Sequence, residues 1–146
     1  MYFSIFVAAL LLVNWFYAMS DILFSTIEKF QQTRGPWGKF LDAGTGSHSL
    51  KWIQTLETIS WDAITADNQM KESIERDSDI KTRFRSEIDS ILVGNWMDES
   101  FCAKLGKYDT ILADYLIGAV DGFSPYMQDI ILEKYVLNVT LFYDFG

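Results

Sequence analysis

The stretch FLDAGTGSHSLKWI, residues 40–53, decides the fold predicted for this chain. The run KFLDA at residues 39–43 is short, apolar and bounded by glycines, which is typical of a buried strand. Apolar residues then recur with helical spacing along residues 49–59; they are Leu50, Ile53, Leu56 and Ile59. A strand, a glycine-containing turn and an amphipathic helix are therefore predicted in that order.

The same alternation continues downstream. Three further apolar runs predict strands: WDAITAD, SILVGN and YDTILAD, at residues 61–67, 90–95 and 108–114. The charged stretch 68–90 between them predicts one or two solvated helices, and residues 96–105 predict another. Parallel strands need a crossover, which is normally a helix, so the alternation predicts a doubly wound, mostly parallel α/β sheet in a three-layer sandwich.

The amino end differs in character from the rest of the sequence. Residues 2–18 are apolar and uncharged, and small residues precede Asp21 with the spacing of a signal-peptide cleavage site. Three interpretations stay open: a removable signal, a membrane anchor, or a helix packed on the domain. A signal predicts a secretory, endomembrane or organellar location, and its absence a cytoplasmic one. Residues 21–36 predict a lead-in helix and turn, which leaves one domain, 37–146.

Composition narrows the class of partner. The sequence has 20 Asp and Glu residues against 12 Lys and Arg, a formal net charge of -8. Such a surface repels a phosphate backbone, so a small-molecule or protein substrate is expected and nucleic acid is not. With one cysteine, Cys102, no intrachain disulfide can form, and with one histidine, His48, no cluster of metal ligands has a recognisable spacing. No metal site is therefore predicted.

The residues that follow each predicted strand are the candidate binding residues, because open parallel sheets bind ligands outside the carboxyl ends of their strands. After the first strand, Gly44 and Gly46 flank Thr45. Glycine permits a positive-φ turn and removes side-chain atoms, so a ligand can approach bare backbone and the start of the next helix. This turn predicts a site for a flat, polar ligand.

Polar residues follow the other three strands as well. After the second strand, Asp67 can accept hydrogen bonds from the vicinal hydroxyls of a ribose. After the third, the Asn95 amide offers a donor and an acceptor to an adenine edge, with Trp96 beside it as an apolar wall. Asp114 and Tyr115 follow the fourth strand. Together these positions predict recognition of a nucleoside.

The order DAGTG, AITAD, VGNW and ILADY resembles the successive motifs of class I S-adenosylmethionine-dependent methyltransferases over residues 37–123. The resemblance implies a Rossmann-like fold, S-adenosyl-L-methionine as cofactor, and transfer of a methyl group to an acceptor that the sequence does not identify. The implied cofactor-binding residues are Asp42, Ala43, Gly44, Thr45, Gly46, Asp67, Asn95, Trp96 and Asp114.

The resemblance also implies a role for each part of this set. Asp42 and the glycine turn would face the methionine part of the cofactor, Asp67 the ribose and Asn95 the adenine. Asp114 would lie near the methyl group and, with Tyr115, would position or deprotonate the acceptor. An Asp also ends many strands without any such role, so both interpretations of Asp114 stay open.

The chain departs from the family pattern at two positions and at its carboxyl end. His48 stands where a third glycine is common, and Asn95 stands where Asp is common. The family continues through three further strands, whereas residues 133–146 have room for one. The sequence therefore predicts either a fragment or a sheet that pairs through its open edge with a second copy.

Two functions besides methyl transfer stay open. One is an NAD(P)-binding oxidoreductase, because GTGSHS at residues 44–49 supplies the first two glycines of the GxGxxG pattern. The other is a non-catalytic remnant of a methyltransferase, associated with a membrane through residues 2–18, that keeps the fold as an interaction module.

Overall fold

The computed structural model describes residues 22–113 and 142–144. The chain divides into two compact units, Met1–Pro36 and Trp37–Gly146. In the first unit, residues 22–31 form the helix predicted for the lead-in segment. Within the described residues no helix is long and apolar enough to cross a membrane, and the predicted signal or anchor at residues 2–18 lies outside them.

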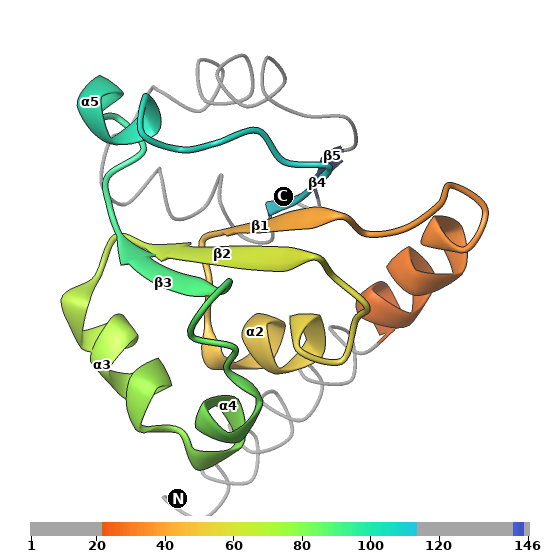
Figure 1. Ribbon diagram of the computed structural model, residues 1–146, viewed down its shortest axis with the longest axis horizontal. Helices are drawn as coiled ribbons and strands as arrows, with labels where there is room; N and C mark the ends of the chain where they lie inside the picture. Colours follow the sequence, from red (N-terminus) through yellow and green to blue (C-terminus); the bar gives the residue numbers. More distant parts are fainter. Residues whose placement is uncertain (1–21, 114–141, 145–146) are drawn as a thin grey trace, which may run out of the picture. The chain divides into compact units, whose positions relative to one another are not determined.

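The second unit alternates strands and helices along the chain (Figure 1). Its elements are β1 (Lys39–Ala43), α2 (Ser47–Ile53), β2 (Ser60–Thr65), α3 (Asn68–Arg76), α4 (Ser78–Arg83), β3 (Ser90–Val93), α5 (Glu99–Cys102), β4 (Thr110–Ala113) and β5 (Phe142–Asp144). The strands form one sheet in the order β3-β2-β1-β4-β5, and every neighbouring pair is parallel. The predicted α/β fold of Rossmann-like type is confirmed.

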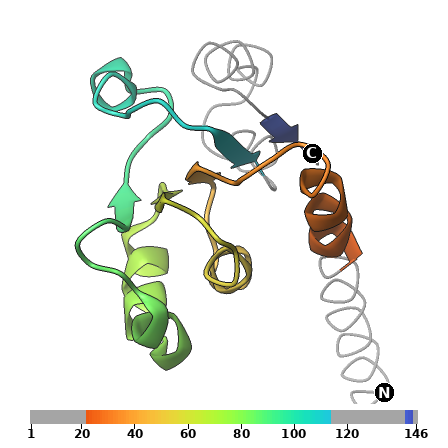
Figure 2. The same cartoon turned by 45° about the vertical axis from the view of Figure 1, so that its right-hand side comes forward.

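Described helices lie on both faces of this sheet. Helices α2, α3 and α4 lie on one face and α5 lies on the other, as Figure 2 shows with the sheet closer to edge-on. The strand order turns back at β1, with β2 and β3 on one side of it and β4 and β5 on the other. The carboxyl ends of β1 and β4 therefore flank the switch point, where sheets of this kind form their ligand crevice.

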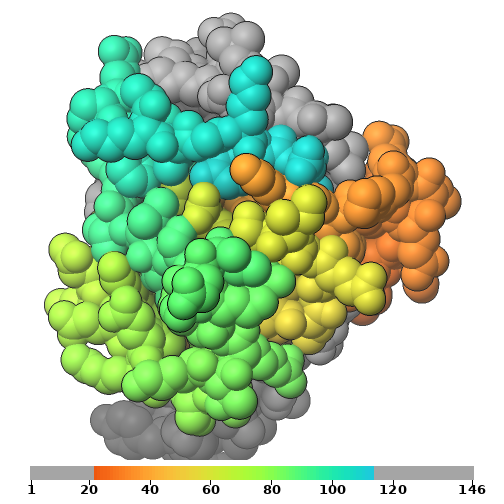
Figure 3. Space-filling view, viewed as in Figure 1, coloured from red at the N-terminus to blue at the C-terminus, as the bar shows by residue number. Residues whose placement is uncertain are grey.

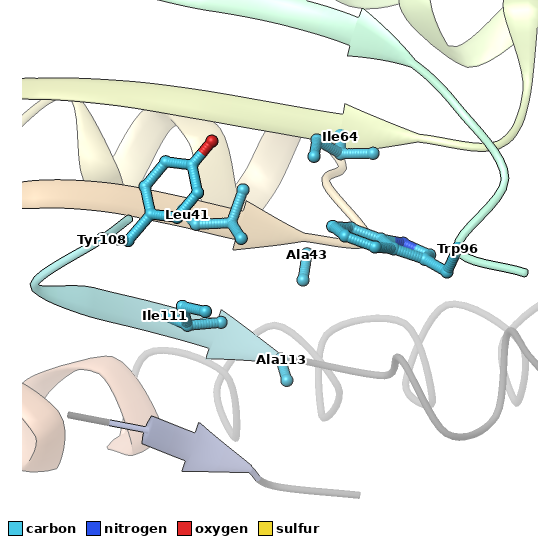
Figure 4. Packing of buried hydrophobic residues seen from close by; sticks show 7 residues of the cluster. All are labelled: Leu41, Ala43, Ile64, Trp96, Tyr108, Ile111 and Ala113. Atoms are coloured by element: carbon cyan, nitrogen blue, oxygen red, sulfur yellow. The ribbon is translucent and has the colours of Figure 1, made fainter. Parts of the chain in front are cut away.

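Side chains of β1 alternate between the two faces and so build a core on each. On the α5 face, one cluster comprises Leu41, Ala43, Ile64, Trp96, Tyr108, Ile111 and Ala113 (Figure 4). On the opposite face, the Phe40 ring contacts Trp37 and Trp52, with centroids 5.8 and 6.3 Å apart. These contacts pack Trp37 and, through Trp52, helix α2 against the amino half of β1.

Helix α2 is shorter than its apolar periodicity predicts. It ends at Ile53, so Leu56 and Ile59 do not extend its buried stripe, and Ile59 is 66% exposed. The following residues instead bring the chain back to the amino edge of the sheet, where the Ile59 amide donates a 2.8 Å hydrogen bond to the Gly38 carbonyl. The predicted helix over residues 49–59 is therefore wrong in its second half.

The remaining predictions hold in outline. The charged stretch 68–90 forms two helices, α3 and α4, before β3 begins at Ser90. The helix predicted over residues 96–105 is confined to Glu99–Cys102. A fifth strand does lie within residues 133–146, and it pairs in parallel with β4.

Candidate functional site

The turn after β1 requires a glycine and is tied to the neighbouring strand. Gly44 has a φ of 106°, in the region that side chains disfavour. The amides of Gly44 and Thr45 both donate to the Ile64 carbonyl at the end of β2, over 3.0 and 2.9 Å. These two donors therefore fix the turn against the sheet, so any polar contact with a ligand has to come from another group of the turn.

Asp42 lies between β1 and α2 and is almost completely buried, with 1% of its surface exposed. The Ser49 hydroxyl donates a 2.9 Å hydrogen bond to Asp42 Oδ2, and Ser49 Oγ lies 3.1 Å from the Gly46 amide that donates to it. The carboxylate thus holds the first turn of α2 on the strand. Whether it also faces a cofactor stays a prediction.

Thr45 carries the one unusual polar group of the turn. The residue is 4% exposed, and its Oγ1 is buried without a hydrogen-bond partner among the residues that the structure describes. A buried hydroxyl without a partner costs about 1 to 3 kcal/mol. Native proteins seldom keep such a group unless something satisfies it, so Thr45 Oγ1 is the candidate hydrogen-bond donor of this turn.

Asp67 and Asn95 follow the neighbouring strands β2 and β3, and both are exposed. Asp67 caps α3 by accepting a 2.8 Å hydrogen bond from the Gln69 amide, and Asn95 Oδ1 accepts one of 2.9 Å from the Met97 amide. Within the described residues, Asp67 Oδ2 and Asn95 Nδ2 make no hydrogen bond, which leaves an acceptor and a donor for a ligand. Parallel pairing brings both residues to the carboxyl edge that carries the Gly44 turn.

Trp96 is a core residue. Figure 4 shows its indole at the ends of β1 and β2, beside Ala43 and Ile64. Its ring also meets Phe101 edge-on, with centroids 6.0 Å apart, and only 8% of the residue is exposed. Only this small exposed part of Trp96 is available to form the predicted apolar wall for an adenine. Most of the ring packs in the core beneath α5.

The remaining candidates lie in the core, in the turn before α2 and outside the described residues. Ala43 is buried in the core on the α5 face, and Gly46 is the extended residue that precedes α2. Asp114 and Tyr115, the predicted catalytic pair, lie outside the described residues, so their role stays a prediction. The Cys102 thiol lies 3.3 Å from the Trp96 carbonyl and is half-buried, in keeping with a packed thiol.

A polar cluster that the sequence analysis missed lies near the opposite, amino end of the strands. Asp62 of β2 accepts hydrogen bonds from the Ser90 hydroxyl and from the Tyr108 hydroxyl, the latter over 2.7 Å. Burial first, and then Asp62, raises the pKa of Tyr108. The signal was an acid in the middle of an apolar run, WDAIT. Because the cluster joins β2, β3 and the segment that leads into β4, it holds the sheet together away from the candidate site.

A second missed pair lies at the same end. Asp89 is buried, and Arg85 binds both of its carboxylate oxygens, over 2.7 and 2.8 Å. The same guanidinium donates to the carbonyl and the hydroxyl of Thr58, and the Trp61 amide donates to Asp89. This network positions the chain that leads into β2 and β3, which is a structural role.

No protein-family model matches the chain. Comparison with curated proteins and with solved structures likewise finds no match.

Proposed function

We propose that the carboxyl edge of the sheet binds S-adenosyl-L-methionine and that the chain is a methyltransferase domain acting on a small-molecule or protein acceptor. The observation that carries the proposal is the buried, unsatisfied Thr45 hydroxyl in a positive-φ glycine turn at the switch point of the sheet. Exposed polar groups of Asp67 and Asn95 follow the next two strands at the same edge. One edge thus offers three recognition groups in the order that the resemblance implies.

The groups present fit the chemical parts of this cofactor. The Thr45 hydroxyl is a donor for the methionine carboxylate, Asp67 Oδ2 is an acceptor for the ribose hydroxyls, and Asn95 Nδ2 is a donor for an adenine nitrogen. Asp42 acts through Ser49, by holding the first turn of α2 in place. When bound, the sulfonium supplies an activated methyl group for an in-line displacement.

Few catalytic side chains are needed for such a transfer. The protein has to align the acceptor with the methyl group, to exclude water and in some cases to accept one proton. We assign that last role to Asp114 and Tyr115, which follow β4 in the sequence.

Ser49 argues against the alternative that the chain is an NAD(P)-binding oxidoreductase. In the GxGxxG pattern the third glycine allows close packing of the helix against the strand. Here Ser49 occupies that place, is 6% exposed and directs its hydroxyl to Asp42. A side chain therefore fills the space that the dinucleotide pattern keeps empty, which favours the methyltransferase proposal.

Isothermal titration calorimetry of the full chain with S-adenosylmethionine, S-adenosylhomocysteine and NAD tests the proposal. We expect both S-adenosyl compounds to bind and NAD to give no heat of binding. Binding of NAD alone would replace the proposal with the oxidoreductase alternative. Binding of none of the three would support the non-catalytic interaction module.

A further inference from the structure

The segment 94–102, which follows β3 and includes α5, is fixed to the sheet at its start. The Gly94 amide donates a 3.0 Å hydrogen bond to the Thr65 carbonyl at the end of β2. The ring of Phe101 packs over Gly94 and occupies the space that a side chain at this position would need. The surface of this segment is the blue-green part of Figure 3. Asn95 therefore follows a backbone position that is held from two sides.

The Asn95 side chain is oriented by its own loop. Its Oδ1 accepts a 2.9 Å hydrogen bond from the Met97 amide, and its backbone carbonyl accepts one of 2.9 Å from the Asp98 amide. The side-chain oxygen is thus directed toward the chain. This leaves the Nδ2 amino group as the part of the exposed side chain that a ligand can meet. Asn95 therefore offers a ligand a hydrogen-bond donor and not an acceptor.

A donor at this position bears on which purine the site accepts. The ring nitrogens N1 and N7 of a purine both adjoin position 6, so a group that binds either nitrogen lies beside the substituent at that position. Adenine carries an amino group there, which is itself a donor, whereas a 6-oxopurine carries an acceptor oxygen. The Asn95 amino group can pair with the oxygen, but two amino groups cannot pair with each other.

We propose that the base subsite at Asn95 accepts a 6-oxopurine at least as well as adenine, an inference that rests on the proposed function. Asn95 is then the residue that sets the base specificity of the cofactor site. One matched hydrogen bond changes an affinity by about fivefold to tenfold. The site therefore binds S-inosylhomocysteine, the 6-oxo analogue of S-adenosylhomocysteine, with an affinity that is equal or up to about tenfold higher.

Calorimetric titration of the full chain with these two compounds tests the inference. Asn95→Asp replaces the donor by an acceptor but keeps the oxygen that the Met97 amide binds, so the variant is expected to fold. It should favour S-adenosylhomocysteine by about fivefold to tenfold. Asp98→Asn is the matched control, because it exchanges the same two side chains at the cap of α5 and should leave the wild-type ratio of affinities unchanged. Thermal transitions check that both variants are folded.

The outcomes separate this inference from the proposed function. The inference is overturned, with the proposed function intact, if the wild type binds S-adenosylhomocysteine more tightly than S-inosylhomocysteine. It is also overturned if Asn95→Asp and Asp98→Asn give the same ratio of affinities. Binding of neither compound to the wild type overturns the proposed function and the inference with it. A ratio that shifts toward S-adenosylhomocysteine in Asn95→Asp alone supports the inference.

Discussion

The Ser49 hydroxyl donates a 2.9 Å hydrogen bond to Asp42 Oδ2 and so joins the first turn of α2 to the buried end of β1. Ser49→Ala removes this donor and leaves a buried carboxylate oxygen without it. We expect the free energy of unfolding in urea to fall by about 1 to 3 kcal/mol. Ser86→Ala, at an exposed turn position, should change it by less than about 0.5 kcal/mol. Equal effects of the two substitutions would mean that the Ser49–Asp42 contact does not stabilise the turn.

Thr45→Val separates a ligand-binding role from a structural one. Replacing an unsatisfied buried hydroxyl by a methyl group of similar size should leave the apo protein equally stable or raise its free energy of unfolding by about 1 kcal/mol. The same variant should bind S-adenosylhomocysteine more weakly. Thr110→Val is the matched control, because Thr110 Oγ1 donates a 2.9 Å hydrogen bond to the Trp37 carbonyl and its loss should destabilise the apo protein. Thermal unfolding with and without ligand measures both effects. A destabilised Thr45→Val apo protein would argue against the ligand role.

Asp67→Asn removes the charge proposed to hold the ribose while keeping a good helix cap. The affinity for S-adenosylhomocysteine should fall by about 1 to 3 kcal/mol with little change in the melting temperature. Asp77→Asn is the control, because Asp77 also caps a helix, α4, but precedes it far from the carboxyl ends of the strands. Calorimetric affinities that are equal for the two variants would remove Asp67 from the site.

The pair between Lys51 and Asp77 predicts a dependence of stability on pH. Lys51 Nζ lies 2.8 Å from Asp77 Oδ2, and this contact is the main reason why the pKa of Asp77 is lowered. Burial opposes it as the next largest effect, and the backbone amides of Ile80 and Asp79 add smaller lowering contributions. Since the folded-state pKa is below the unfolded one, the stabilisation is complete above about pH 5 and is lost progressively as the pH falls through the unfolded-state and then the folded-state value.

Lys51→Met should therefore flatten the loss of unfolding free energy between about pH 5 and about pH 2, measured by urea denaturation at each pH. Lys71→Met provides the comparison, because Lys71 faces Glu75 at 3.7 Å along one helix and contributes a weaker pair. If the wild type and Lys51→Met lose stability in parallel as the pH falls, the pair is not the cause.

The strands were predictable because each is a short apolar run between turn residues, and β1 begins and ends at the residues that its sequence indicates. The end of α2 was not. Leu56 and Ile59 continue the helical period, but residues after Ile53 form long-range hydrogen bonds in place of helical ones. Arg85 donates to the Thr58 carbonyl, and the Ile59 amide donates to the Gly38 carbonyl. Local periodicity contains no information about such contacts, so tertiary structure overrode it.

The candidate site was predictable only as positions on the sheet. In a parallel sheet the residues after β2 and β3 lie at the same edge as the Gly44 turn, and this is why Asp67 and Asn95 are candidates. The sequence did not reveal that Trp96 turns into the core, that Ser49 engages Asp42, or that the Thr45 hydroxyl is buried without a partner among the described residues. Those facts depend on side-chain packing.

The central claim, that the carboxyl edge of the sheet holds an S-adenosyl cofactor, is tested most directly by nuclear magnetic resonance. Titration of the ¹⁵N-labelled chain with S-adenosylhomocysteine is predicted to shift the amides of Gly44, Thr45, Asp67 and Asn95 while leaving those of Ile80 and Lys81 unchanged. The absence of any shift at the Gly44 turn, or shifts confined to other parts of the sheet, would contradict the account.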